Sequence, residues 1–209
     1  MGSAGHSFTI AFQPPPGPDA LTMAARLAPN PKYPVLNDAL RVRTVVFVDE
    51  QGCAADTEID DEDQRSWHWV AYDGTEPAPV GVVRLVPPPH EGHHSHEDEG
   101  KGEPGSTRHD EPFVRIGRLA VLPAYRGKGL GRILVDTALK WAVVHTREVG
   151  AALDAGLRWN GLTFIHAQTA VEGMYARLGF VTDKSLGQWD EEGIPHIGMW
   201  KTVEVCREG

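Results

Sequence analysis

The chain has 209 residues, 41% of them hydrophobic, which suits one compact domain and is short for two. Its net charge of −9 argues against a nucleic-acid binder, which would carry a basic face. No apolar stretch approaches the ~18 residues of a membrane span, and the first residues lack a secretory pattern. Cys53 and Cys206 share no metal-type spacing, so we expect free thiols and a soluble, cytoplasmic protein.

The first half of the chain predicts three strands and one helix. Residues 8–12 alternate apolar and polar side chains, as a strand does. Residues 13–34 are rich in proline and read as loop, with one helical turn near residues 21–27. Residues 35–47 carry apolar side chains at helical spacing. Two further strands, 67–72 and 80–86, flank a turn at Asp73-Gly74.

Two segments have unusual charge. Residues 49–63 hold eight acids and no lysine or arginine. We expect these acids either to face a cationic acceptor or to form a solvated surface loop. Residues 87–112 contain histidines, acids, proline and glycine without a large apolar side chain, so we expect a flexible insertion. Its histidines at 90, 93, 94 and 96 have no fixed spacing for a metal, and we assign no metal site.

The second half predicts a strand at 113–121, a helix at 130–149, a strand at 162–168, a short helix at 171–178 closed by Gly179, and strands at 180–182 and 196–203. This order indicates an α/β (or α+β) fold in a single domain, 1–209, with residues 1–34 partly irregular.

A glycine-rich turn between the strand at 113–121 and the following helix predicts an anion site. Gly127, Gly129 and Gly131 leave the backbone unobstructed where the helix begins, and free N–H groups there bind phosphate. The cations nearby are Arg126, Lys128 and Arg132. The turn lacks the Gly-Lys-Ser/Thr ending of a Walker A loop and the Gly-x-Gly-x-x-Gly spacing of a dinucleotide fold.

These residues resemble the GNAT superfamily of N-acetyltransferases. The run Arg126-Gly-Lys-Gly-Leu-Gly is similar to the family's pyrophosphate loop, Gly117-Arg-Leu-Ala-Val to its fourth strand, and Tyr175-Ala-Arg-Leu-Gly-Phe to a Tyr-x-x-x-Gly-Phe signature. The segments Arg43–Cys53 and Gly193–Met199 resemble the ElaA-like branch. The resemblance implies a central mixed, mostly antiparallel sheet of about six to seven strands flanked by helices.

The resemblance also implies acetyl-CoA as cofactor, with CoA as product. The strand backbone would hold the pantetheine arm, the turn would hold the pyrophosphate, and Gln168 would add to the site. The cofactor-binding residues are then Leu119, Ala120, Val121, Arg126, Gly127, Lys128, Gly129, Leu130, Gly131, Arg132 and Gln168.

The catalytic residues implied by the resemblance are an acid and a base. Tyr175 matches the family's general acid, which protonates the leaving thiolate. Glu50, His68 and His196 are candidates for the base that deprotonates the acceptor, and a water relay is the remaining alternative.

The function expected is transfer of an acetyl group to a primary amine of a small molecule, an amino sugar such as glucosamine or a polyamine, in a ternary complex. The alternatives are a protein lysine or N-terminal acetyltransferase, a non-catalytic acyl-CoA-binding module, and a scaffold built around the insertion. We expect no nucleic-acid or membrane partner, and a homodimer is a possible assembly.

Overall fold

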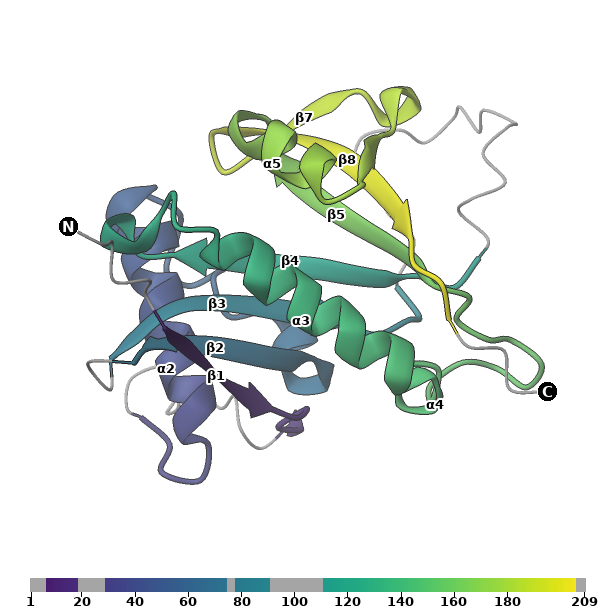
Figure 1. Ribbon diagram of the computed structural model, residues 1–209, viewed down its shortest axis with the longest axis horizontal. Coiled ribbons are helices and arrows are strands. Elements are labelled where there is room, and N and C mark those ends of the chain that lie inside the picture. The colour runs from purple at the N-terminus through teal and green to yellow at the C-terminus, as the bar shows by residue number, and fades with distance from the viewer. Residues whose placement is uncertain (1–6, 19–28, 75–77, 91–110, 206–209) are drawn as a thin grey trace.

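The protein is described by a computed structural model over residues 7–18, 29–74, 78–90 and 111–205. An eight-stranded sheet runs in the order β1-β2-β3-β4-β5-β8-β6, and β7 pairs with β8 beside this path (Figure 1). The strands are β1 Phe8–Gln13, β2 Trp67–Asp73, β3 Pro79–Val86, β4 Val114–Val121, β5 Leu162–Gln168, β6 Val181–Thr182, β7 Gln188–Glu191 and β8 Ile194–Thr202. Since β4 and β5 are parallel and the other pairs antiparallel, the predicted α/β fold with a mixed sheet is confirmed.

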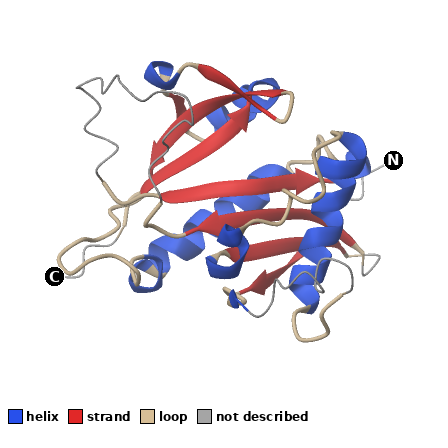
Figure 2. Cartoon of the chain, turned by 180° about the vertical axis from the view of Figure 1, so that it is seen from behind, coloured by secondary structure: helices blue, strands red, loops and turns tan. Residues whose placement is uncertain are grey.

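Helices cover both faces of this sheet (Figure 2). They are α2 Pro34–Arg43, α3 Leu130–Val144, α4 Thr146–Val149 and α5 Glu172–Arg177, with a π-helix at Thr44–Glu50 and 3-10 turns at Asp61–Arg65, Pro123–Tyr125, Thr169–Val171 and Lys184–Leu186. Trp69 and Val83 belong to the core shared with α3, whereas Val70 and Val82 belong to the core shared with α2. Because successive side chains of a strand point to opposite faces, β2 and β3 are buried on both sides and read as almost continuous apolar runs.

The helix predicted at 130–149 ends earlier, at Val144. His145 leaves the helical conformation with φ −112° and ψ 42°. Its ring stacks on Trp141 with centroids 4.3 Å apart, and its Nδ1 donates to the Trp141 carbonyl at 2.8 Å. The same carbonyl also accepts the backbone N–H of His145 at 3.0 Å, which closes the last turn of α3, and the chain restarts as the short helix α4.

The helix predicted at 35–47 is α2 followed by the π-helix. In the π-helix the backbone N–H of Gln51 reaches the carbonyl of Val46 at 3.2 Å, five residues back. This extension carries Glu50 and Gln51 to the part of the sheet where β4 and β5 separate.

Other sequence predictions differ in detail. The strand at 180–182 is β6, Val181–Thr182, and β7 was not predicted. The helical turn expected near residues 21–27 lies outside the described residues, as does most of the 87–112 insertion. Among the helices of the described residues, none is long and apolar enough to cross a membrane.

A gap opens between β4 and β5 in the middle of the sheet. Only residues 114–116 pair with residues 163–165, and beyond them the two strands diverge (Figure 1). On its other side β4 carries a bulge, because Val82 pairs with Ala120 while Arg84 pairs with Gly117. Arg118 in this bulge has a left-handed backbone, φ 49°. A bulge bends its strand, and here β4 and β5 face an open cleft instead of each other.

Candidate active site

A cleft of about 1110 Å³ fills this gap. On the α3 side it is lined by the β4–α3 turn and by α5 residues such as Tyr175. On the α2 side it is lined by Phe47, Gln51 and the β7–β8 hairpin. The cleft therefore connects the two faces of the sheet, and a cofactor and an acceptor could enter it from opposite sides.

The β4–α3 turn has the features of a diphosphate site. Gly127 and Gly129 have φ of 74° and 80°, and a Cβ at either would meet no atom within 4 Å, so the backbone borders open space. Helix α3 begins at Leu130, and N–H groups of a first helical turn have no partner within the helix. A Cβ at Gly131 would stand 3.4 Å from Met174 Sδ. The turn thus offers donors without side-chain obstruction, which fits the pyrophosphate of CoA.

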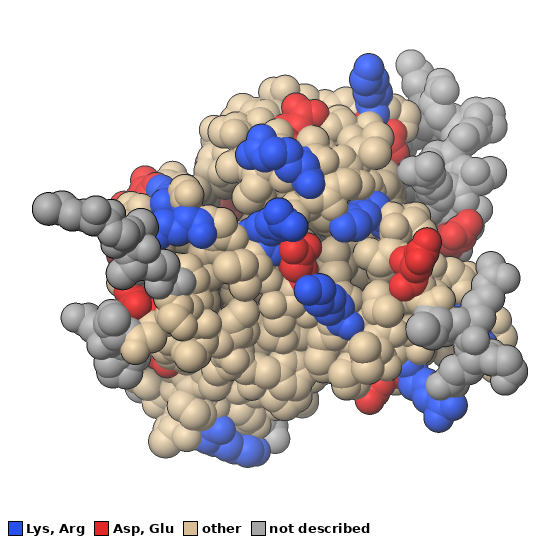
Figure 3. Space-filling view, in the orientation of Figure 1, with Lys and Arg blue, Asp and Glu red and all other residues tan. Residues whose placement is uncertain are grey.

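The basic side chains of the turn differ in position. Arg126 and Arg132 line the cleft together with Arg177 of α5, and Figure 3 shows basic side chains on both sides of the groove on this face. Arg132 also lies 3.4 Å from Asp136. Lys128 is not among the lining residues, and its ammonium lies 4.9 Å from the centre of the Tyr125 ring.

Arg126 and Glu50, predicted for different roles, contact each other. Both carboxylate oxygens of Glu50 accept from the Arg126 guanidinium at 2.6 Å. Arg126 Nε donates to the Val121 carbonyl at 2.9 Å. The hydrogen bond from Arg126 lowers the pKa of Glu50. A carboxylate held in this way is a weak base.

Tyr175 of α5 lines the cleft. Its side chain is buried, and its ring packs edge-on against Phe180 with centroids 5.8 Å apart. Burial raises the pKa of the phenol. A phenol kept protonated in this way can donate a proton when a better base forms beside it. Leu119, Ala120, Val121 and Leu130 line the same cleft.

The α2 side of the cleft contains two histidines and a glutamate. His196 of β8 and His166 of β5 both line the cleft, as does Glu191 at the end of β7. Glu191 Oε1 accepts from His166 Nδ1 at 2.8 Å and from Trp189 Nε1 at 2.7 Å. Although burial favours its neutral form, these hydrogen bonds lower the pKa of Glu191 to about 2. Its carboxylate is therefore ionised at neutral pH.

Two contacts join the walls of the cleft on this side. Gln168 of β5 donates to the side chain of Gln51 at 3.0 Å. Glu192 in the β7–β8 turn accepts from the Ala54 N–H at 2.7 Å and from the Thr57 hydroxyl at 2.6 Å. Glu192 has a left-handed backbone, φ 54°, which costs energy for a residue other than glycine. The acceptor side is thus partly covered by its own loops.

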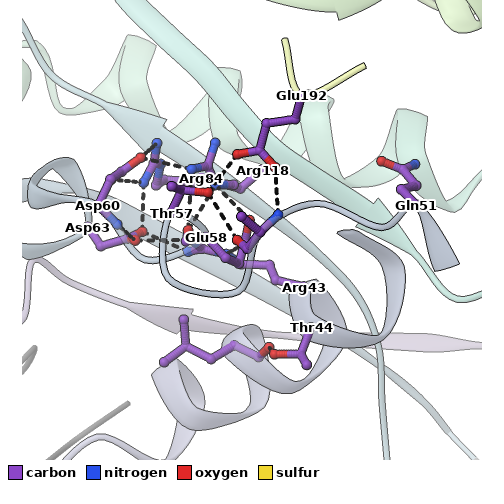
Figure 4. Close-up of polar contacts among 12 residues, drawn as sticks. Arg43, Thr44, Gln51, Thr57, Glu58, Asp60, Asp63, Arg84, Arg118 and Glu192 are labelled. Atoms are coloured by element: carbon purple, nitrogen blue, oxygen red, sulfur yellow. Dashed lines mark hydrogen bonds and ion pairs between the residues drawn. The ribbon is translucent and has the colours of Figure 1, made fainter. Parts of the chain in front are cut away.

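The acidic stretch at 49–63 lies in two environments. Asp49, Glu50, Asp56 and Asp61 are exposed, as expected of a surface loop. Glu58, Asp60 and Asp63 bind arginines in a partly buried network (Figure 4), and Glu58 and Asp60 also line the cleft. Asp63 accepts from Arg43 at 2.7 Å and from Arg84 at 2.8 Å. Asp60 accepts from Arg84 and Arg118, each at 3.0 Å.

The network also contains His68, one of the candidate bases. Its side chain is fully buried, its Nε2 lies 3.1 Å from Asp63 Oδ1, and burial lowers its pKa. The network fixes the loop before β2 against β3 and β4. Its negative charge is matched by arginine, so it does not attract a cationic acceptor strongly.

Sequence reasoning missed Glu191, His166, Gln51 and Arg118 as cleft residues. The signal for Glu191 was its place five residues before His196, across a turn containing Gly193. A hairpin there would have brought the two side chains together. His166 and Gln168 alternate along one strand, which puts them on one face.

The fold and cleft are those of an acyl-CoA-dependent acyltransferase, and comparison identifies the family. A model of the acetyltransferase (GNAT) domain matches residues 64–182, more than half of the chain. The chain therefore belongs to the GNAT family of N-acetyltransferases.

Three known proteins illustrate the similarity. The N-acetyltransferase YjcF of Bacillus subtilis is 30% identical over 181 residues, 86% of this chain and 99% of YjcF. Protein ElaA of Escherichia coli is 27% identical over 165 residues, 78% of this chain and 85% of ElaA. An acyl-CoA N-acyltransferase structure from Pseudomonas aeruginosa is 26% identical with a TM-score of 0.59, covering 94% of this chain and all of that one (100%). The predicted ElaA-like resemblance, the enzyme class and the use of acetyl-CoA are confirmed.

Proposed function

We propose that this enzyme acetylates the primary amine of a small molecule, an amino sugar such as glucosamine or a polyamine, by direct attack in a ternary complex. The observation that carries the proposal is the continuous cleft through the sheet, with the diphosphate turn at one end and Glu191 and His196 at the other. Because it connects both faces, both substrates can meet in it without a covalent enzyme intermediate.

The loops that partly cover the α2 side of the cleft favour a small acceptor. The Gln51–Gln168 and Glu192–Thr57 contacts narrow the approach to His196, which disfavours a folded protein surface as substrate. A cationic amine is favoured by Glu191, whose carboxylate is ionised and is not bound to an arginine in the described residues.

The residues of this chain have separate tasks in the proposed reaction. When bound, acetyl-CoA supplies a thioester whose acetyl group passes to the amine. Backbone N–H groups of residues 119–121 would stabilise charge on the carbonyl oxygen. His196 would take a proton from the amine, and Tyr175 would give one to the departing sulfur. We prefer His196 to Glu50 as base because Glu50 is held by Arg126.

The test is CoA release from acetyl-CoA with glucosamine, spermidine and a lysine peptide as acceptors, with the product identified by mass. Acetylation of glucosamine or spermidine well above the peptide supports the proposal. Preference for the peptide would instead favour a protein acetyltransferase.

We also propose a cytoplasmic location, supported by the free thiol of Cys53, and we retain a homodimer as a proposal that the solution mass can test.

A further inference from the structure

Glu191 is held so that only one of its oxygens is occupied. Oε1 takes both hydrogen bonds, from His166 and from Trp189. Within the described residues Oε2 accepts none, and its neighbour is His196 Nε2 at 3.8 Å. Two donors on one oxygen fix the rotation of the carboxylate and direct the other oxygen toward His196.

His196 is held with the complementary tautomer. Its Nδ1 lies 2.8 Å from the Ile194 carbonyl, which can only accept a hydrogen bond, so Nδ1 carries the proton. In the neutral ring Nε2 is then the acceptor. Two acceptor atoms, Glu191 Oε2 and His196 Nε2, therefore face each other across 3.8 Å.

This pair of atoms suits a donor of two hydrogen bonds. An atom placed between them can lie about 2.9 Å from each, the ordinary length of an N–H hydrogen bond. An ammonium group supplies several donors and a positive charge, which the ionised Glu191 attracts.

We propose that Glu191 Oε2 and His196 Nε2 together receive the ammonium group of the acceptor, with Glu191 binding the cation and His196 removing its proton. The inference rests on the proposed function, acetylation of a primary amine. It adds Glu191 as an acceptor-binding residue and His166 and Trp189 as the residues that position it.

The proton transfer balances within this pair. One N–H bond of the ammonium breaks, its electron pair stays on the amine nitrogen, and a new N–H bond forms at His196 Nε2. Glu191 remains ionised and balances the imidazolium that results. The free amine, still bonded to Glu191 Oε2, can then attack.

Other charged and titratable groups also line this part of the cleft. Besides His166 and Glu191, they include Cys53, Glu58 and Asp60 in the loop before β2, Arg84 on β3, Arg115 and Arg118 on β4, and Glu192 in the β7–β8 turn. Glu58 is paired with Arg43, and the carboxylate of Glu192 bonds to Ala54 and Thr57, on the opposite wall. Glu191 is thus the carboxylate beside His196. Asp190 on the same strand provides a matched control, because it is not among the cleft-lining residues and its Oδ1 accepts from the Gly193 N–H at 2.8 Å.

The experiment compares Glu191→Gln, Asp190→Asn and His196→Gln with the acceptor of the panel that is turned over fastest. Acceptor binding is measured by calorimetry with CoA present, and kcat/KM is measured across pH. We expect Glu191→Gln to weaken acceptor binding about 10-fold or more, as the loss of a charge-assisted contact does. Asp190→Asn, which retains an oxygen that can accept from the Gly193 N–H, should change it less than about threefold.

His196→Gln should weaken acceptor binding less than Glu191→Gln does, because it removes no charge, and should lower kcat/KM about 10²–10⁴-fold, with loss of the acidic limb of the pH profile.

Two positioning variants keep the aromatic packing. His166→Phe and Trp189→Phe each remove one donor to Oε1 while retaining a ring against its neighbours. Each should weaken acceptor binding less than Glu191→Gln does. Equal binding by Glu191→Gln and the wild type, or a larger loss in Asp190→Asn, would overturn the inference. Failure of every amine in the panel would instead contradict the proposed function itself.

Discussion

The Glu50 carboxylate and the Arg126 guanidinium form a two-point ion pair, with both contacts at 2.6 Å. The pair joins the end of the π-helix to the turn before α3, two segments 76 residues apart in the chain. The pair holds Arg126 at the edge of the cleft. A phosphate bound there can replace Glu50 as the partner of the guanidinium, or both anions can contact the guanidinium together.

The first prediction concerns this pair. Arg126→Ala should weaken acetyl-CoA binding about 10-fold or more, because a charge-assisted contact contributes about 1.5–3 kcal/mol. Glu50→Gln, which leaves the arginine in place, should preserve or strengthen binding. Calorimetry with acetyl-CoA measures both. Equal losses in the two variants would mean that the pair serves only to hold the turn.

The second prediction concerns Gly129. Gly129→Ala puts a Cβ on a left-handed backbone at the cleft, and Gly156→Ala does the same at φ 95° in a loop outside the cleft lining. Both should lose about 1–2 kcal/mol of unfolding free energy. Only Gly129→Ala should weaken acetyl-CoA binding. A similar loss of binding in both variants would contradict a direct role for the turn.

The third prediction concerns Tyr175. Tyr175→Phe keeps the ring against Phe180 and removes the hydroxyl. If the phenol protonates the leaving thiolate, kcat should fall about 10²–10⁴-fold with little change in acetyl-CoA affinity. Pre-steady-state kinetics isolates the chemical step. A variant with nearly full single-turnover rate would show that Tyr175 only packs.

The fourth prediction concerns Asp63. Although burial favours the neutral carboxyl, Arg43 and Arg84 hold its pKa well below the usual value. A lowered folded-state pKa contributes stability above the unfolded value, about 3.9, and that stability is lost as pH falls toward the folded pKa. The wild type should therefore lose unfolding free energy steeply below about pH 4.

The matched variants are Asp63→Asn, at a buried position, and Asp61→Asn, at an exposed position of the same turn. Asp63→Asn should cost about 3–5 kcal/mol at pH 7, since it leaves buried arginines with less negative charge. Asp61→Asn should cost under about 0.5 kcal/mol. Denaturant titrations at pH 7 and pH 3 measure both, and similar costs for the two at pH 7 would contradict a structural role for the network.

The fold was predictable where the pattern is strong. The buried strands and the stripe of Leu130, Leu134 and Ala138 gave the core elements, and the glycine-rich turn gave the cofactor site. By contrast, β7 reads Gln-Trp-Asp-Glu and is mostly polar, and within the described residues it pairs with β8 alone. A strand of this composition carries no apolar alternation to recognise.

The acceptor side was harder to predict because its contacts are long-range. The acids at 49–63 meet Arg84 and Arg118, which the sequence places on later strands. Only the sheet register brings them together. His166 lies on β5, far from Glu191 and His196 in the sequence. The pairing of β5 with β8 brings His166 to the β7–β8 hairpin, where it contacts Glu191.

The most direct test of the account is an initial-velocity experiment in which acetyl-CoA and a small amine are varied together, with the intact protein mass measured after acetyl-CoA alone. Direct transfer in one cleft predicts intersecting double-reciprocal lines, an acetylated amine as product and an unmodified enzyme mass. Parallel lines with an acetylated enzyme would contradict it, as would the absence of amine acetylation.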